Sequence, residues 1–166
     1  MKIALINGSP KANGSVSALI LQSLRERFPD HQEQRDDGAC GTCINTYHFS
    51  KPQINQQDLA ELAACDTLVF AFPLYVDGIP SHLLSCLSQM EGYLKPLASK
   101  EMRVYAIVNC GFYEGRQNQH ALDMMQNWCA KTRLIWGHGL GIGGAMGWRQ
   151  QIKVNGLKVR DLSLRK

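Results

Sequence analysis

The chain has 166 residues, of which 45% are hydrophobic and 19% are charged, values typical of one globular domain around one core. Its formal net charge is only +4, and the basic residues near the C-terminus are not interleaved with aromatic residues, so we expect no nucleic-acid partner. The chain has no apolar run of membrane-spanning length and no signal peptide, so we expect a cytoplasmic protein without membrane contact.

Strand-like runs and helix-like stripes of apolar residues alternate along the chain. We expect strands at 2–6, 67–72 and 103–108 and a last strand that starts at 134–136, with helices at about 15–28, 58–64, 80–94 and 117–131. The polar stretch 29–57 should hold a further strand, although no apolar run marks its position. A glycine-rich stretch, 137–147, is expected to follow the last strand.

Apolar residues at helical spacing predict which face of each helix is buried. The predicted stripes are Val16, Leu19, Ile20, Leu24 and Phe28 in the first helix, Leu59, Leu62 and Ala63 in the second, Leu83, Leu84, Leu87 and Met90 in the third, and Ala121, Leu122, Met125, Trp128 and Cys129 in the fourth. Pro80 fits the first turn of the third helix.

Alternation of strands and helices implies right-handed crossovers and a parallel sheet with helices on both faces. We therefore expect residues 1–166 to form a single α/β domain, a doubly wound five-stranded parallel sheet. Residues 148–166 are short for the helix that usually follows the last strand, and Asn155-Gly156 indicates a turn among them. A missing helix would leave apolar surface uncovered. We predict that a second subunit covers it, with Trp148 at the interface of a homodimer or larger homo-oligomer.

The turn after the first strand, residues 7–17, carries glycines, small hydroxyls and one lysine before a helix begins. Free N–H groups and the dipole at a helix N-terminus favour an anion. The further groups available are the hydroxyls of Ser9, Ser15 and Ser17 and the ammonium group of Lys11. The turn matches neither a Walker A loop nor a dinucleotide fingerprint, so it predicts a mononucleotide phosphate. The alternative is an ordinary turn in which Ser15 only caps the helix.

Two further loops follow strands. The loop 72–80 is apolar between two prolines, which a flat aromatic ligand would explain, unless Tyr75 and Ile79 fold back onto the core or meet a partner subunit. The loop 109–115 offers the amide of Asn109, and Gly111 permits close backbone approach. Because parallel sheets bind ligands beyond the carboxyl ends of their strands, the three loops predict a pocket with a phosphate end and a planar apolar end.

These loops carry a resemblance to a known family. Residues 8–16, Gly-Ser-Pro-Lys-Ala-Asn-Gly-Ser-Val, and the loop from Pro73 to Pro80 resemble the NADPH-dependent FMN reductase and multimeric flavodoxin branch of flavodoxin-like proteins. The corresponding loops of that family read approximately Gly-Ser-Pro-Arg/Lys-x-x-Gly-Asn-Thr and Pro-x-Tyr-x-x-x-x-Pro. The similarity covers most of residues 1–145 and implies a flavodoxin-like fold. Val16 is a departure, since the family usually has a hydroxyl there, although the backbone N–H of Val16 remains available.

The resemblance also implies a set of site residues. The FMN phosphate would be held by Ser9, Lys11, Ser15, Val16 and Ser17, the isoalloxazine ring would be lined by Pro73, Leu74, Tyr75 and Val76, and Asn109, Cys110, Gly111 and Phe112 would complete the ring site. No catalytic acid, base or nucleophile of the chain is needed, because the flavin carries the chemistry.

The activity implied is electron transfer from NAD(P)H to a small acceptor such as a quinone or a free flavin. One alternative is a non-enzymatic electron carrier that serves a partner protein, but short flavodoxins of that kind are usually acidic and this chain has a charge of +4. The other is a binding module with a vestigial flavin site.

The remaining motifs predict no metal site. Cys40-Gly41-Thr42-Cys43 lacks the further cysteines of an iron–sulfur cluster, and a zinc site built from it and His48 would need Gln53 as its fourth ligand. A redox dithiol or a plain loop remain as interpretations. The other cysteines, Cys65, Cys86, Cys110 and Cys129, read as buried apolar residues. The stretch 139–144 matches Gly-x-Gly-x-x-Gly, but we interpret it as a decoy because no full βαβ unit follows.

Overall fold

The computed structural model describes residues 1–11, 14–28, 41–97, 101–145 and 147. Five strands form one parallel sheet in the order β2-β1-β3-β4-β5. They are β1 (Lys2–Asn7), β2 (Cys43–His48), β3 (Thr67–Pro73), β4 (Arg103–Asn109) and β5 (Ile135–Ile142). The predicted five-stranded parallel sheet is therefore confirmed. Cys40, Trp148 and the basic residues of 152–166 lie outside the described residues, so the expectations that concern them stay predictions.

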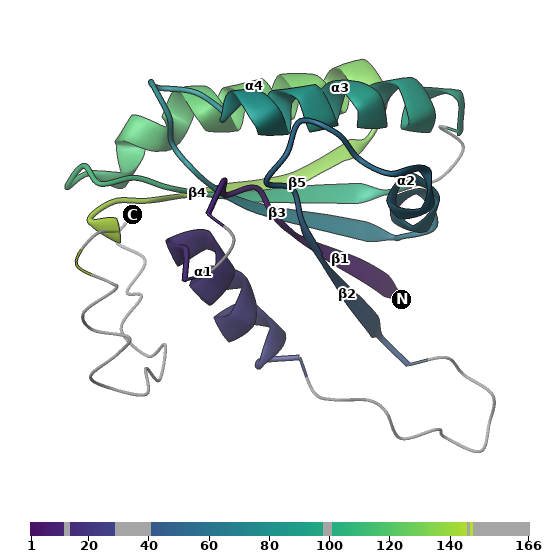
Figure 1. The fold of residues 1–166 in the computed structure, drawn as a ribbon, viewed down its shortest axis with the longest axis horizontal. Coiled ribbons are helices and arrows are strands. Elements are labelled where there is room, and N and C mark those ends of the chain that lie inside the picture. The colour runs from purple at the N-terminus through teal and green to yellow at the C-terminus, as the bar shows by residue number, and fades with distance from the viewer. Residues whose placement is uncertain (12–13, 29–40, 98–100, 146, 148–166) are drawn as a thin grey trace.

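Helices cover both faces of this sheet, as the alternation predicted. They are α1 (Val16–Arg25), α2 (Gln56–Ala63), α3 (Ser81–Leu94) and α4 (Gln119–Thr132), with short 3₁₀ helices η1 (Lys95–Leu97) and η2 (Gly115–Asn118). Figure 1 shows α2, α3 and α4 on one face and α1 on the other. None of the described helices is long and apolar enough to cross a membrane.

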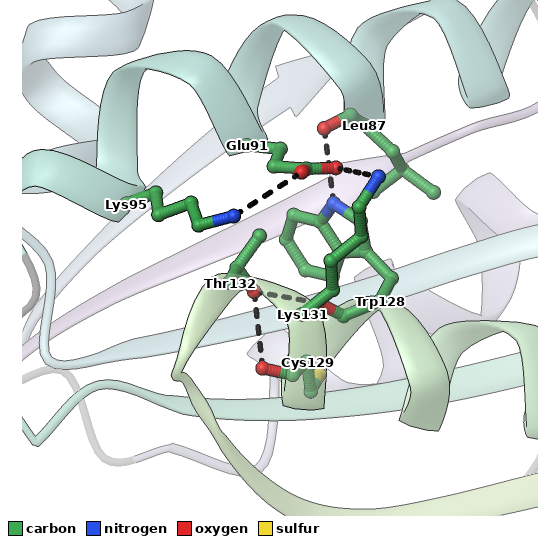
Figure 2. Close-up of polar contacts among 7 residues, drawn as sticks. All are labelled: Leu87, Glu91, Lys95, Trp128, Cys129, Lys131 and Thr132. Carbon is green, nitrogen blue, oxygen red and sulfur yellow. Dashed lines mark hydrogen bonds and ion pairs between the residues drawn. The ribbon is translucent and has the colours of Figure 1, made fainter.

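The larger part of the core lies between the sheet and α2, α3 and α4. Phe70 and Phe72 of β3 are fully buried there, and the ring of Trp128 meets Phe70 edge-on with centroids 5.9 Å apart. The indole N–H of Trp128 donates to the carbonyl oxygen of Leu87 at 3.0 Å, which ties α4 to α3 (Figure 2). A smaller apolar cluster lies between the sheet and α1.

An ionic cluster joins the C-terminal ends of α3 and α4. Glu91 lies between Lys131 at 3.0 Å and Lys95 at 4.0 Å, and the hydroxyl of Thr132 donates to the carbonyl oxygen of Trp128 at 2.7 Å (Figure 2). Cations at helix C-termini offset the negative end of the dipole. A hollow of about 420 Å³ at these helix ends is lined by Lys95, Lys131 and Arg133 together with Glu91. We attribute its basic side chains to this offset of the helix dipoles and not to an anion site.

β2 is the strand that the apolar pattern could not place. It lies at the edge of the sheet and pairs only with β1 among the described strands, so most of its side chains face solvent and only Tyr47 is buried. The Tyr47 hydroxyl donates to a carboxylate oxygen of Glu61 at 2.9 Å. Burial, together with this carboxylate, raises the pKa of Tyr47 to about 12.

β5 corrects the expectation that the glycine-rich stretch 137–147 follows the last strand, because the strand includes part of this stretch and continues to Ile142. The glycines within β5 and directly after it allow close backbone packing. A Cβ on Gly141 would lie 2.5 Å from the carbonyl oxygen of Gly115, and a Cβ on Gly143 would clash with the carbonyl oxygen of Tyr113. The Gly-x-Gly-x-x-Gly match begins inside this strand rather than in a turn after one, so its glycines serve packing.

The predicted helix faces are partly corrected. In α1 the buried residues are Ser17 and Leu21, while Val16 and its predicted companions are only partly buried. In α3, Leu84 is exposed, and Pro80 precedes the helix as its N-cap instead of entering the first turn. All five predicted residues of α4 are buried.

The α1 face of the sheet leaves an apolar groove of about 620 Å³ beside that helix. It is lined by side chains from β1, from α1 and the residues after it, and from β3 to β5, among them Leu24, Phe28, Val69, Tyr105, Ile107 and Leu140. Val69 is buried, Tyr105 and Ile107 are half-buried, and Leu140 is exposed. The prediction that apolar surface is left uncovered concerns residues 148–166, which lie outside the described residues, so it stays a prediction.

Candidate functional site

The carboxyl ends of β1, β3 and β4 lie side by side. Asn7 pairs in register with Ala71, and Pro73 pairs with Asn109. From β1 the chain passes outward to β2 on one side and then returns to β3 on the other, so the strand order reverses at β1. In sheets of this kind ligands bind at such a reversal.

Hydrogen bonds within the turn and to β3 hold the start of the first turn, residues 7–11. The backbone N–H of Gly8 donates to the carbonyl oxygen of Ala71 at 2.8 Å, and the N–H of Ser9 donates to Asn7 Oδ1 at 3.0 Å. A Cβ on Gly8 would lie 2.5 Å from a methyl carbon of Leu83, so a residue without a side chain allows this close approach. Ser9 is buried and accepts from the N–H of Lys11 at 3.3 Å.

α1 begins directly at this turn. Ser15 is its N-cap, and its side-chain oxygen accepts from the N–H of Ala18 at 3.1 Å, as the capping interpretation expected. Capping does not use the donors that an anion needs. The N–H groups of Val16 and Ser17 lie in the first helical turn of α1, where the helix itself offers them no acceptor. The departure at Val16 therefore changes a side chain and leaves the backbone donor in place.

Asn109 joins the three turns. Its side-chain nitrogen donates to the hydroxyl oxygen of Ser17 at 2.9 Å and to the carbonyl oxygen of Phe72 at 3.0 Å. The backbone carbonyl oxygen of Asn109 accepts from the N–H of Leu74 at 2.8 Å. Asn109 is only 4% exposed, so this predicted site residue braces α1 and the second loop rather than presenting its amide to solvent.

The second loop makes a tight turn beyond Pro73. Tyr75 and Gly78 exchange two backbone hydrogen bonds of 3.1 and 3.0 Å, and the two residues between them, Val76 and Asp77, have φ angles of 46° and 57°. Positive φ at both central positions defines a type I′ turn. A β-branched residue in this region costs about 1–3 kcal/mol, and such strain concentrates at functional sites. Val76 is fully exposed at the tip.

The loop was interpreted either as a surface for a flat ligand or as a segment that folds back onto the core, and different parts of the loop fit each interpretation. Ile79 is buried in the core, and Leu74 is half-buried and packs against it, so this part of the loop does fold back. Tyr75 is 45% exposed and Val76 is fully exposed, so the tip presents apolar surface to a ligand or a partner.

The third loop is held to the end of β5. The N–H of Cys110 donates to the carbonyl oxygen of Ile142 at 2.9 Å, and the N–H of Gly144 donates to that of Phe112 at 2.6 Å. The Cys110 side chain is buried, with its sulfur 3.4 Å from Asn118 Nδ2. Gly111 and Phe112 are exposed. Of the four predicted residues in this region, only these two present their surface to solvent.

Sequence reasoning missed four polar residues near this edge. Asn7 holds the first turn, while His48 and His82 contact the carbonyl oxygens of Ser9 and Gly8. Asn118 is fully buried, and its Oδ1 has no hydrogen-bond partner among the described residues. The available signal was position alone, since Asn7 closes an apolar strand and His82 opens the helix after the second loop.

The cysteines within the described residues fit a structural role. Burial raises the pKa of the Cys86 thiol to about 11 and that of the Cys129 thiol to about 12, so both are protonated at neutral pH. Cys65 is buried as well, whereas Cys43 is exposed. Over the described part of the chain, no three histidine, cysteine or acidic side chains are grouped so that they could hold a metal ion.

The fold and the turns define a class: doubly wound α/β proteins with a candidate anion-binding turn at the reversal of strand order. Residues 1–87 match the model of a family described by its flavodoxin-like fold. Since the match spans more than half of the 166 residues, the chain belongs to this family. The resemblance seen in the two loops is thus confirmed at the level of the family.

Solved structures of similar fold include three with oxidoreductase names or bound FMN. An NADPH-quinone reductase from P. pentosaceus is 14% identical with a TM-score of 0.61, over 93% of this chain and 99% of that one. General stress protein 14 from Treponema denticola, in complex with FMN, is 11% identical with a TM-score of 0.60, over 92% and 91%. An FMN-dependent NADH-azoreductase from Bacillus anthracis, also with FMN, is 14% identical with a TM-score of 0.60, over 91% and 93%. At these identities the likeness shows the fold. No curated protein matches the sequence.

Proposed function

We propose that this chain binds FMN and transfers electrons from NAD(P)H to a small acceptor such as a quinone or a free flavin. The observation that carries the proposal is the junction of three turns through Asn109, at the place where sheets of this topology bind ligands. Two of the similar solved structures hold FMN, and this supports the choice of ligand.

The phosphate end of the site would be formed by the first turn. Its residues are Ser9, Lys11, Ser15, Val16 and Ser17. The first-turn N–H groups of α1 and the helix dipole suit an anion, and the exposed Lys11 adds a positive charge. Because Ser17 accepts its hydrogen bond from Asn109, the Ser17 O–H remains a donor that can serve a phosphate oxygen.

The ring end would be formed by the second and third loops. Its residues are Pro73, Leu74, Tyr75, Val76, Asn109, Cys110, Gly111 and Phe112. When FMN is bound it supplies the redox chemistry, so the chain's task is to hold and orient the ring and to limit its access to water. The exposed apolar tip at Tyr75 and Val76, with Phe112 on the third loop, offers the surface against which a flat ring can stack.

The test is a visible spectrum followed by reduction. Purified protein is incubated with FMN, freed of unbound flavin and scanned, and NADPH is then added without oxygen. We expect retained flavin absorption that bleaches on NADPH addition. Replacing Lys11 with glutamine should weaken FMN binding, while the same change at the exposed Lys51, on the loop after β2, serves as the matched control. A protein that retains no flavin would contradict the proposal and favour a vestigial site.

Whether the protein is an enzyme or an electron carrier needs a separate assay. NADPH oxidation with a quinone alone, without a partner protein, is expected for an enzyme and not for an electron carrier. The net charge of +4 favours the enzyme.

We further propose a homodimer in which a second subunit covers the groove beside α1. The exposed Leu140 and the half-buried Tyr105 and Ile107 in that groove support this proposal.

A further inference from the structure

Two histidines hold consecutive carbonyl groups of the first turn. His82 Nε2 lies 3.2 Å from the carbonyl oxygen of Gly8, and His48 Nε2 lies 2.8 Å from that of Ser9. A carbonyl oxygen only accepts hydrogen bonds, so each Nε2 carries its proton and donates. Neither contact needs a charged imidazole.

The two histidines come from different elements, the strand β2 and the helix α3. His48 is the last residue of β2, in register with Asn7 of β1, and the following N–H of Phe49 donates to the carbonyl oxygen of Asn7 at 2.9 Å. His82 is the second residue of α3, the helix that follows β3. The turn is therefore held from the side of β2 by one imidazole and from the side of α3 by the other.

Together with Asn7, these contacts fix the peptide between Gly8 and Ser9 at both ends. Its carbonyl oxygen is bound by His82, and its N–H donates to Asn7 Oδ1 at 3.0 Å. The next carbonyl, that of Ser9, is bound by His48, and the peptide that follows has no N–H because residue 10 is proline. Both carbonyl oxygens thus face hydrogen-bond donors, the two imidazoles. Because these contacts hold the backbone on both sides of Ser9, its hydroxyl is carried by a turn of fixed geometry.

We propose that His48 and His82 are positioning residues of a phosphate-monoester site, which they preorganise by binding the carbonyl oxygens of Ser9 and Gly8. This inference rests on the proposed FMN function and adds that the two imidazoles act on the phosphate end of the ligand and not on its ring. Their effect is therefore specific for FMN over riboflavin, which has the same ring system without a phosphate.

The experiment measures the Kd of the full chain for FMN and for riboflavin in wild type, His48→Leu, His82→Leu, His48→Gln and His82→Gln. Each leucine variant loses one hydrogen bond and should weaken FMN binding about three- to tenfold, with riboflavin unchanged. Glutamine places an amide N–H near the position of Nε2 and should restore most of the FMN affinity. His120→Leu, at an exposed residue of α4, is the control and should change neither Kd.

Unchanged FMN affinity in both leucine variants, or equal losses for FMN and riboflavin, would overturn the inference. If a leucine variant does not fold, asparagine replaces it, because its shorter amide reaches the Nδ1 position but not the carbonyl. Asparagine should then bind FMN as weakly as we expect for leucine, and wild-type affinity in its place would overturn the inference. A wild-type protein that binds neither flavin would contradict the proposed function itself, an outcome distinct from the variant results.

Discussion

Replacing Asn109 with alanine tests whether one buried amide holds the candidate site together. The substitution removes the donations to Ser17 Oγ at 2.9 Å and to the Phe72 carbonyl oxygen at 3.0 Å. At about 0.5–1.5 kcal/mol for each hydrogen bond, the expected loss in the free energy of unfolding is about 1–3 kcal/mol. For a domain of this size that corresponds to a fall in Tm of roughly 2–12 °C. The backbone contact between Asn109 and Leu74 survives, because it does not use the side chain.

The assay is thermal unfolding followed by circular dichroism, without flavin, and then titration with FMN. Asn127→Ala, at an exposed position of α4, is the matched control and should change stability by no more than about 0.5 kcal/mol. We expect the Asn109 variant to bind FMN more weakly as well, because Ser17 and the second loop lose their common anchor. A variant with the Tm and FMN affinity of the wild type would refute the bracing role of Asn109.

Three further predictions concern features outside this junction. Gly141→Ala should destabilise the chain by about 1–3 kcal/mol in urea unfolding, since its Cβ would lie 2.5 Å from the Gly115 carbonyl oxygen, whereas Gly92→Ala, with no atom within 4 Å of its Cβ, should be neutral or slightly stabilising. Ultraviolet titration of the folded protein should show one tyrosine with a pKa of about 12, and this titration should be missing in Tyr47→Phe. The folded-state pKa of Tyr47 exceeds the unfolded value of about 10. The stability that Tyr47 contributes is therefore present below pH 10 and is lost as the pH rises through 12. Leu140→Glu should convert the proposed dimer to a monomer in size-exclusion chromatography with light scattering, and a monomeric wild type would count against the dimer.

The fold could be predicted where burial leaves a strong apolar signal, as a continuous apolar run in a strand covered on both faces or as an apolar stripe on one face of a helix. β3 and the buried face of α4 were predicted closely for this reason. β2 gave no such signal, because an edge strand buries little beyond Tyr47. The length of β5 was missed because glycine is usually a mark of loops, whereas Gly141 permits backbone contact with Gly115.

The site could be predicted as a set of loops but not as a network. Local motifs identified the three turns, and the parallel topology implied that they meet. The contacts that connect them join residues distant in the chain, such as Asn109 with Ser17, and a single sequence does not reveal such pairs. His48 and His82 were missed for the same reason, because each acts on the backbone of a remote turn.

The attachment of the third loop to β5 has a consequence for how this scaffold can diversify. Backbone hydrogen bonds and glycine contacts hold the loop, while the side chains of Phe112 and Tyr113 are 56% and 96% exposed. Substitutions of Phe112 and Tyr113 can therefore change the exposed surface of the third loop without disturbing its main chain. Evolution could therefore change the side chains at this exposed surface while the main chain that carries them stays the same.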